Sequence, residues 1–280
     1  MSAAGFFTII RPANAVMAGV AAVVAYFIAT GTIIPAALLL LIVVTLITAA
    51  GNVINDYFDA DIDAVNRADR PIPSGQVSRE AALWYAVALF FSGIAVCLFT
   101  NWICIAFAVI NSLLLALYAA RLKSMPLIGN IAVAYLSGSM FLFGGAFAGM
   151  DGLIHLFPIA AMTFLAMMAR ELLKDAEDVE GDKTGGAVTL PIRIGVKKTA
   201  LAAVVFVVLS AIASTVPFLW WGIPYLVLIG IVDLVLLGAA IKALSCDTPA
   251  CVRQSKASGM LKFGMFASLL VFVVSALFFG

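Results

Sequence analysis

The chain has 280 residues, of which 64% are hydrophobic and only 11% are charged, and its mean hydropathy is +1.16. A soluble protein does not need so large an apolar fraction, so the composition indicates a polytopic membrane protein, and the net charge of +1 argues against nucleic acid as a partner. The four cysteines form no CxxC pair and only one histidine accompanies them, so we expect neither structural zinc nor a disulfide framework.

Nine apolar segments follow one another, each close to the ~20 residues that a helix needs to cross a bilayer. They span residues 12–30, 33–55, 80–98, 102–120, 129–149, 153–174, 199–219, 222–244 and 258–279. The first follows Arg11 and has full length, unlike the short apolar region of a cleavable signal peptide. The sequence therefore predicts an all-α integral membrane protein that forms a single domain over residues 1–280.

The positive charges of the chain give these segments an orientation. All sixteen Lys and Arg residues lie in the N-terminal segment, in the loops 56–79, 121–128, 175–198 and 245–257, or within a turn or two of them. The links on the other side, near Gly31, Asn101, Asp151 and Trp221, carry none. Because positive residues favour the cytoplasmic side, we predict a cytoplasmic N-terminus and, with nine spans, a C-terminus outside the cell.

A stripe of polar residues ends the second apolar segment. Asn52, Asp56, Asp59 and Asp63 recur at i, i+4, i+7 and i+11, which places them on one face of a helix. Carboxylates at the end of a membrane helix are costly unless something positive binds them, and hard oxygen ligands suit Mg²⁺ and the phosphates it carries. Asp61 falls off this stripe, and we expect it to be a solvated loop residue.

A second stripe with the same spacing ends the sixth apolar segment. Glu171, Asp175, Asp178 and Asp182 again stand at i, i+4, i+7 and i+11. Each stripe could be a solvated helix end, but two in one register, in a chain with few charges, favour Mg²⁺ ions on either side of one diphosphate. The candidate metal ligands are Asn52, Asp56, Asp59, Asp63, Asp175, Asp178 and Asp182.

Other polar residues on the same side are candidates for holding substrate. They are Arg11, Asn14, Asn52, Arg67, Arg70, Lys123, Lys174 and Arg193. The alternative is a topogenic role for the basic residues, helix capping for Asn14, and pairing with carboxylates or headgroups for Lys174 and Arg170. Asp233 lies within the eighth segment, where it would be protonated or bonded to a polar neighbour, and His155 is expected at the non-cytoplasmic interface.

Four phrases of the sequence resemble one family. NDYFDADID, NRADRPIPSG, YAARLK and KDAEDVEGD are similar to motifs of the UbiA superfamily of membrane prenyltransferases. The likeness covers nearly the whole chain, in the same motif order. The matching residues are Asn55, Asp56, Asp59 and Asp63 of an NDxxDxxxD motif, Arg70 to Gly75 of an RPxxSG segment, Tyr118 and Lys123 of a tyrosine-to-lysine motif, and Asp178 and Asp182 of a second DxxxD motif.

This resemblance implies nine transmembrane helices around a central cavity, with both aspartate motifs at its cytoplasmic end. It also implies a reaction in which Mg²⁺ and basic side chains bind a prenyl diphosphate, its C–O bond ionises, and a nucleophile captures the allylic cation. Tyr118 would face the reacting carbon or a phosphate oxygen, although a tyrosine of the interfacial belt is the alternative. The candidate catalytic residues are Asp56, Asp59, Asp63, Tyr118, Lys123, Asp175, Asp178 and Asp182.

Within the family, GNIAVAYLSG and FLFGGAF are similar to the archaeal branch that prenylates a lipid phosphate. That likeness implies transfer of a geranylgeranyl group from geranylgeranyl diphosphate to the free hydroxyl of geranylgeranylglyceryl phosphate, giving digeranylgeranylglyceryl phosphate. The alternative within the family is an aromatic acceptor of quinone, haem or chlorophyll synthesis. An ion transporter is a different class, but transporter sites usually lie at the bilayer midplane, whereas these acids cluster at one end.

Two further expectations concern charge. The cytoplasmic end offers more positive charge than one Mg²⁺-bound diphosphate needs, so we expect separate subsets for the two substrates, with Lys123 and Arg67 on the donor and Arg11 and Arg193 on the acceptor. Because unpaired carboxylates repel one another when no metal is bound, we also expect the metal-free Asp56→Asn variant to be more thermostable than the wild type.

Overall fold

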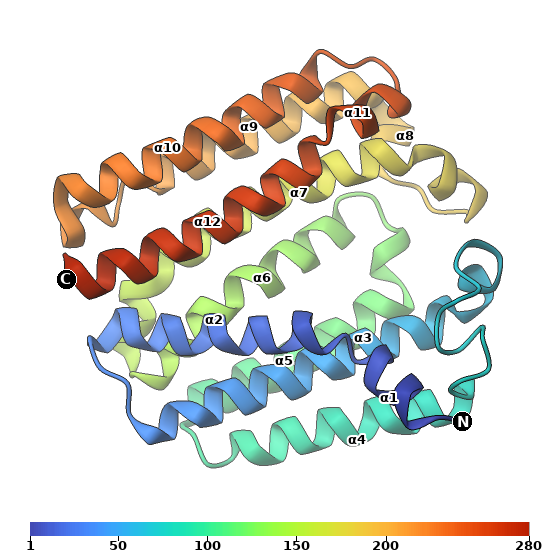
Figure 1. Ribbon diagram of the computed structural model, residues 1–280, viewed down its shortest axis with the longest axis horizontal. Helices are drawn as coiled ribbons and strands as arrows, with labels where there is room; N and C mark the ends of the chain where they lie inside the picture. Colours follow the sequence, from blue (N-terminus) through green and yellow to red (C-terminus); the bar gives the residue numbers. More distant parts are fainter. Residues whose placement is uncertain (280) are drawn as a thin grey trace. The chain divides into compact units, whose positions relative to one another are not determined.

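The computed structural model describes residues 1–279, apart from the side chain of Asn66, and all regular elements of this part are helices (Figure 1). The chain divides into two compact units, one formed by Met1–Leu122 with Leu142–Ile154 and the other by Lys123–Phe141 with His155–Gly280. Each unit is described by itself below. The single domain over residues 1–280 stays a prediction.

The first unit is built around α3 (Leu38–Asn66), which packs against α2 (Pro12–Thr30), α4 (Arg79–Cys97) and α5 (Trp102–Ala120). Leu40, Val43 and Ile47 of α3 lie in its apolar core. A Cβ atom at Gly19 of α2 would come within 2.6 Å of the Leu41 carbonyl oxygen, so glycine allows α2 and α3 to approach closely. The unit also contains α1 (Ala3–Ile9), η1 (Pro35–Ala37) and the C-terminal end of α6 (Ile128–Phe147).

The second unit contains most of α7 (Met150–Thr184) and all of the helices that follow. In it α10 packs against both α9 and α12, with Tyr225 and Phe272 among the fully buried side chains. The Ser210 hydroxyl donates a hydrogen bond of 2.9 Å to the Met162 carbonyl and so ties α9 to α7. The remaining elements are η2 (Leu122–Ser124), at the boundary between the units, and α8 (Leu190–Ile194), α9 (Val196–Ala213), α10 (Phe218–Leu244), α11 (Pro249–Ser255) and α12 (Ala257–Phe278).

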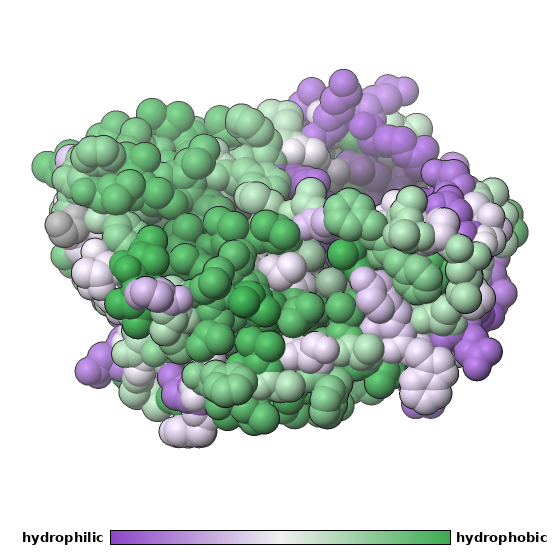
Figure 2. Space-filling model, turned by 60° about the horizontal axis from the view of Figure 1, so that its bottom comes forward, coloured by the Kyte–Doolittle hydropathy of each residue, from purple (hydrophilic) through white to green (hydrophobic). Residues whose placement is uncertain are grey.

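Nine helical stretches of the described part are long and apolar enough to cross a membrane, which confirms the predicted number. Their outer side chains are apolar as well: Phe91, Phe99 and Trp102 each expose more than 70% of their surface. Hydrophobic side chains cover much of the face drawn in Figure 2. A surface of this kind is stable in lipid and would aggregate in water, so the chain is a multi-pass membrane protein.

The two helices that carry the stripes are longer than predicted. The apolar segments were expected to end at residues 55 and 174, but α3 continues to Asn66 and α7 to Thr184. Hydropathy falls where the carboxylates begin, although the helical backbone goes on. All eight stripe residues are therefore helical, and Asp61 lies within α3 and not in a loop as expected.

Other boundaries differ for local reasons. The link predicted near Trp221 lies earlier, because α9 ends at Ala213 and α10 begins at Phe218 after Pro217. Gly222 still marks a kink, with a φ of 65° inside α10. The helices α1, α8 and α11 were not predicted, because five to seven residues are too few for a spanning segment.

Two of three isolated predictions have clear outcomes, and the interfacial place of His155 stays a prediction. Asp233 has a polar neighbour, as one alternative held, because the Ser214 hydroxyl donates to its carboxylate at 2.6 Å. The ring of His155 stacks on Trp220 with 3.8 Å between centroids. No disulfide framework was expected, and the structure contains one disulfide, between Cys246 and Cys251 across a short turn.

Candidate active site

Two carboxylates of the first stripe are buried and paired with arginines. Asp56 and Asp63 are only 4% and 6% exposed. Arg11 Nη2 lies 2.5 Å from Asp56 Oδ1, while Arg70 Nη1 lies 2.5 Å from Asp63 Oδ2 and 3.3 Å from Asp56 Oδ1. Buried carboxylates are tolerated when charge-assisted hydrogen bonds replace their hydration, and these two arginines supply such bonds.

Asn52 holds the backbone that presents Arg11. Arg11 adopts a left-handed conformation with φ of 50°, between α1 and the Pro12 that begins α2. The Asn52 side chain donates a hydrogen bond of 2.9 Å from Nδ2 to the carbonyl of Ile10. Because a non-glycine residue reaches this conformation only at a cost, the bond from α3 helps to fix it. Asn52 thus has a positioning role here, and its amide oxygen is the atom that could serve a metal.

A compact turn after α3 presents Arg70. Its backbone N–H donates to the carbonyl of Arg67 at 3.0 Å, and the Ser74 hydroxyl donates to the Arg70 carbonyl at 2.7 Å. Gly75 closes the turn with a φ of 74°, a conformation that favours glycine. The RPxxSG segment therefore folds so that one arginine returns to the two buried carboxylates of α3.

The other acids of α3 have different surroundings. Asn55 Nδ2 donates a hydrogen bond of 2.9 Å to Asp59 Oδ2, one helical turn further along. The side chain of Asp61 is 82% exposed and pairs with Arg79 at 3.0 Å. Asp61 is therefore solvated and separate from the stripe, as its spacing predicts.

The second stripe begins with one buried and one half-buried acid on α7. Glu171 is 7% exposed and pairs with its neighbour Arg170, so Arg170 binds a carboxylate, as one alternative held. Asn130 of α6, itself 7% exposed, donates a hydrogen bond of 2.9 Å from Nδ2 to Asp175 Oδ2. The contact repeats the Asn55–Asp59 arrangement of α3, since in both an amide orients one carboxylate oxygen.

The last two acids of this stripe lie nearer to solvent. Asp178 has a side chain that is 52% exposed, and Arg253 Nη2 lies 3.8 Å from its Oδ1. Asp182 is half-buried, and its Oδ2 is a buried oxygen without a hydrogen-bond partner. An orphaned carboxylate oxygen is costly unless a cation meets it, so Asp182 fits a ligand that is a metal ion.

The remaining candidates are spread over both units. Asn14, Arg67, Lys174 and Arg193 are exposed, whereas Tyr118 and Lys123 are half-buried. Arg67 ends α3, where its N–H donates to the Asp63 carbonyl at 2.8 Å. The structure thus joins Arg11, Asn52 and Arg70 to the first stripe, and leaves the substrate-binding role of the other basic residues as a prediction.

The chemistry of the stripes fits magnesium. Among the described residues no group of three or more His, Cys, Asp or Glu side chains is already gathered as a metal site. Carboxylate and amide oxygens are nevertheless the ligands that Mg²⁺ prefers, and Mg²⁺ is usually bound by one or two carboxylates together with water and substrate phosphate. Two observations agree with Mg²⁺ binding by these carboxylates. Asp182 has a buried oxygen without a hydrogen-bond partner, and Asn55 and Asn130 orient Asp59 and Asp175.

Two partners that other helices bring to the second stripe were not among the predicted site residues. Asn130 opens α6 after a Pro- and Gly-containing turn, and its type and position gave a weak signal. Arg253 lies 75 residues beyond Asp178 in the numbering, so no helical spacing connects the two. Only the folded chain brings these residues to α7.

Comparison with known proteins agrees with this geometry. A family model described as the UbiA prenyltransferase family matches residues 18–278. The digeranylgeranylglyceryl phosphate synthase of Methanoregula boonei is 60% identical over 278 residues, which cover 99% of this chain and all of that protein.

Two solved structures extend the comparison. One described as digeranylgeranylglyceryl phosphate synthase in membranes is 38% identical, has a TM-score of 0.85, and the match covers 98% of each chain. A UbiA homolog from Archaeoglobus fulgidus bound to GPP and Mg²⁺ is 14% identical with a TM-score of 0.66, over 96% of this chain and 99% of that one. At so low an identity, this second likeness concerns the fold.

Proposed function

The chain belongs to the UbiA prenyltransferase family, and we propose that it transfers a geranylgeranyl group from geranylgeranyl diphosphate to the free hydroxyl of geranylgeranylglyceryl phosphate. The bond between C1 of the donor and its diphosphate oxygen breaks, the acceptor hydroxyl oxygen bonds to C1, and the hydroxyl proton is released with diphosphate. The full-length identity of 60% to a digeranylgeranylglyceryl phosphate synthase is the observation that carries this proposal.

Magnesium is the cofactor of this proposal. The residues that would hold it are Asp56, Asp59 and Asp63 with Asn52 in the first unit, and Asp175, Asp178 and Asp182 in the second. Bound there, Mg²⁺ neutralises negative charge on the diphosphate leaving group as a Lewis acid.

The protein's own side chains contribute charge and shape. Arg11 and Arg70 hold guanidinium groups at the first stripe, where they can donate to phosphate oxygens as they now donate to Asp56 and Asp63. Phe, Met and Leu side chains of the spanning helices provide apolar surroundings for the isoprenoid chains and keep water from the allylic carbon. Both effects suit a substrate with an anionic head and an apolar tail.

We also propose that the site faces the cytoplasm, with the N-terminus on that side and the C-terminus outside. The sixteen Lys and Arg residues support this orientation, because none lies in the links near Gly31, Asn101, Asp151 and Trp221. A cytoplasmic site would receive diphosphate substrates from the compartment that makes them.

A purified-protein assay tests the reaction. The protein, with Mg²⁺ and geranylgeranyl diphosphate, is offered geranylgeranylglyceryl phosphate or 4-hydroxybenzoate, and products are identified by mass spectrometry. We expect the ether lipid product with the glycerol phosphate acceptor and little product with the aromatic acid, and no product from the Asp56→Ala variant. Preference for the aromatic acid would show that the acceptor assignment is wrong, and absence of transfer to either acceptor would contradict the proposed reaction.

A further inference from the structure

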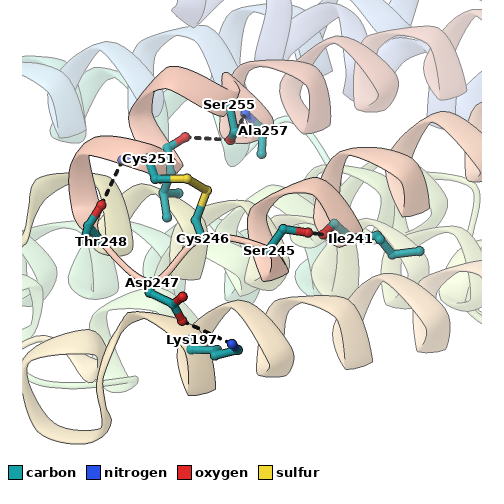
Figure 3. The surroundings of a disulfide bond; sticks show 10 residues. Lys197, Ile241, Ser245, Cys246, Asp247, Thr248, Cys251, Ser255 and Ala257 are labelled. Atoms are coloured by element: carbon teal, nitrogen blue, oxygen red, sulfur yellow. Dashed lines mark hydrogen bonds and ion pairs between the residues drawn. A yellow bond between two sulfur atoms is a disulfide. The ribbon is translucent and has the colours of Figure 1, made fainter.

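A disulfide-bonded turn connects α10 to α11 (Figure 3). Cys246 and Cys251 join its two ends, and the Thr248 hydroxyl accepts a hydrogen bond of 3.3 Å from the backbone N–H of Cys251. Asp247, between them, pairs with Lys197 of α9 at 3.1 Å. The disulfide and the Thr248 bond restrict the short helix α11, which carries Arg253, whereas the pair of Asp247 and Lys197 is exposed and contributes little.

Arg253 reaches from α11 to the acidic end of α7. Its Nη2 donates a hydrogen bond of 2.6 Å to the Glu177 carbonyl and lies 3.8 Å from Asp178 Oδ1. The strong contact is thus with the main chain, and the contact with the carboxylate is long. The guanidinium is held beside Asp178 without a close ion pair.

The ion pair of Arg253 and Asp178 is too exposed to contribute much to the stability of the fold. The side chains of Arg253 and Asp178 are 60% and 52% exposed, and an exposed pair of this kind contributes about 0–1 kcal/mol. Both contacts use Nη2, whereas a guanidinium has five N–H donors in a planar fork that matches phosphate oxygens. Arg253 can keep its bond to the Glu177 carbonyl while its other nitrogens meet an anion.

We propose that Arg253 is a further diphosphate-binding residue, held ready by its hydrogen bond to the Glu177 carbonyl. The inference rests on the proposed function, in which Asp178 helps to hold Mg²⁺. A diphosphate bound to Mg²⁺ at Asp178 brings its oxygens to the side of α7 on which the guanidinium lies. The main-chain bond fixes the guanidinium in advance, so less conformational entropy is lost on binding.

Calorimetric titration of the detergent-solubilised protein tests this without turnover. The protein is titrated first with Mg²⁺ alone and then, at saturating Mg²⁺, with inorganic diphosphate. The variants are Arg253→Ala and Arg253→Lys, and the matched control is Lys197→Ala, which removes one exposed positive charge from α9 at its pair with Asp247. The KM values for both substrates are measured in parallel.

We expect Arg253→Ala to weaken diphosphate binding about tenfold, the value of one charge-assisted hydrogen bond. Its binding of Mg²⁺ alone should change less than about twofold, since an exposed like charge is screened. The KM for geranylgeranyl diphosphate should rise with the Kd, and that for the acceptor should not. Arg253→Lys should recover part of the affinity, and Lys197→Ala should resemble the wild type.

Three results would overturn the inference. Arg253→Ala could bind diphosphate as tightly as the wild type does. Its affinity for Mg²⁺ alone could fall as much as its affinity for diphosphate. Lys197→Ala could weaken diphosphate binding as much as Arg253→Ala does. An equal loss of Mg²⁺ binding would mean that Arg253 only maintains the structure of α7. An equal effect of Lys197→Ala would mean that diphosphate binding depends on the total positive charge and not on Arg253. If the wild type bound no diphosphate with Mg²⁺, the proposed function itself would fail, which separates the two conclusions.

Discussion

Replacing Asp56 with Asn in the metal-free protein tests how the first stripe is stabilised. The sequence suggests that its carboxylates are unpaired and repel one another, so that this variant would gain stability. The structure contradicts the premise, because Arg11 and Arg70 pair with Asp56 and Arg70 also pairs with Asp63. We therefore expect Asp56→Asn to lower the stability of the metal-free protein.

The size of the loss follows from the contacts. An asparagine keeps the volume of Asp56 but removes the charge from two contacts of 2.5 and 3.3 Å. A hydrogen bond to a charged group contributes about 1.5–3 kcal/mol. Arg70 keeps Asp63 at 2.5 Å, and Arg11 is 39% exposed and can turn to water, so a loss of about 2 kcal/mol is expected from these two contacts together.

Thermal unfolding in EDTA, followed by intrinsic fluorescence, measures this loss as a lower apparent melting temperature. Asp61→Asn is the matched control, because it removes the same charge from α3 at an exposed pair with Arg79 that contributes about 0–1 kcal/mol. A melting temperature of Asp56→Asn above that of the wild type would refute the reasoning, since repulsion would then outweigh the ion pairs. Equal losses in both variants would also refute it.

The other predictions concern metal, catalysis, topology and the acceptor. Activity should vanish in EDTA and return with Mg²⁺, and full turnover in the chelator would exclude a metal role. Asp178→Ala should reduce kcat by orders of magnitude, and Asp61→Ala should change it little. An equal fall of kcat in both variants would contradict the assignment of metal binding to the stripe residues. A cysteine introduced near Asp247 should be labelled only from the cytoplasm and one added after residue 280 only from outside, and labelling of both from one side would mean an even number of spans. Arg193→Ala should raise the KM for geranylgeranylglyceryl phosphate more than that for the donor, and an equal rise in both would mean a shared set of basic residues.

The spacing of residues in the sequence was enough to predict contacts within one helix. The i, i+4 pattern predicted that the acids of α3 and α7 share a helical face, and the bond between Asn55 and Asp59 has that spacing. Hydropathy predicted nine spanning helices but not their ends, because a helix can continue after its residues become polar. The extension of α3 to Asn66 required arginines that bind the buried carboxylates, and apolar content carries no signal for them.

Contacts between distant parts of the chain could not be predicted in the same way. Asn130 is 45 residues from Asp175, and Arg253 is 76 residues from the Glu177 carbonyl that it binds. The bond between Cys246 and Cys251 was missed because the expectation considered only CxxC spacing, whereas a turn brings cysteines five residues apart to a Cα distance of 5.4 Å. The contacts of Asn130 and Arg253 depend on how helices pack, which no short pattern records.

The charges of the two stripes differ in a way that bears on how a metal would bind. On α3 the two buried carboxylates are matched by the guanidiniums of Arg11 and Arg70. A metal that takes Asp56 Oδ1 or Asp63 Oδ2 would therefore displace an arginine. A free Mg²⁺ ion offers the displaced guanidinium nothing in return, whereas Mg²⁺ that arrives with a diphosphate brings oxygens that the same guanidinium can bind. On the proposed function, the first stripe should thus prefer the metal–diphosphate complex over the metal alone, because the ion pairs seen without ligand exchange for new ones of the same kind.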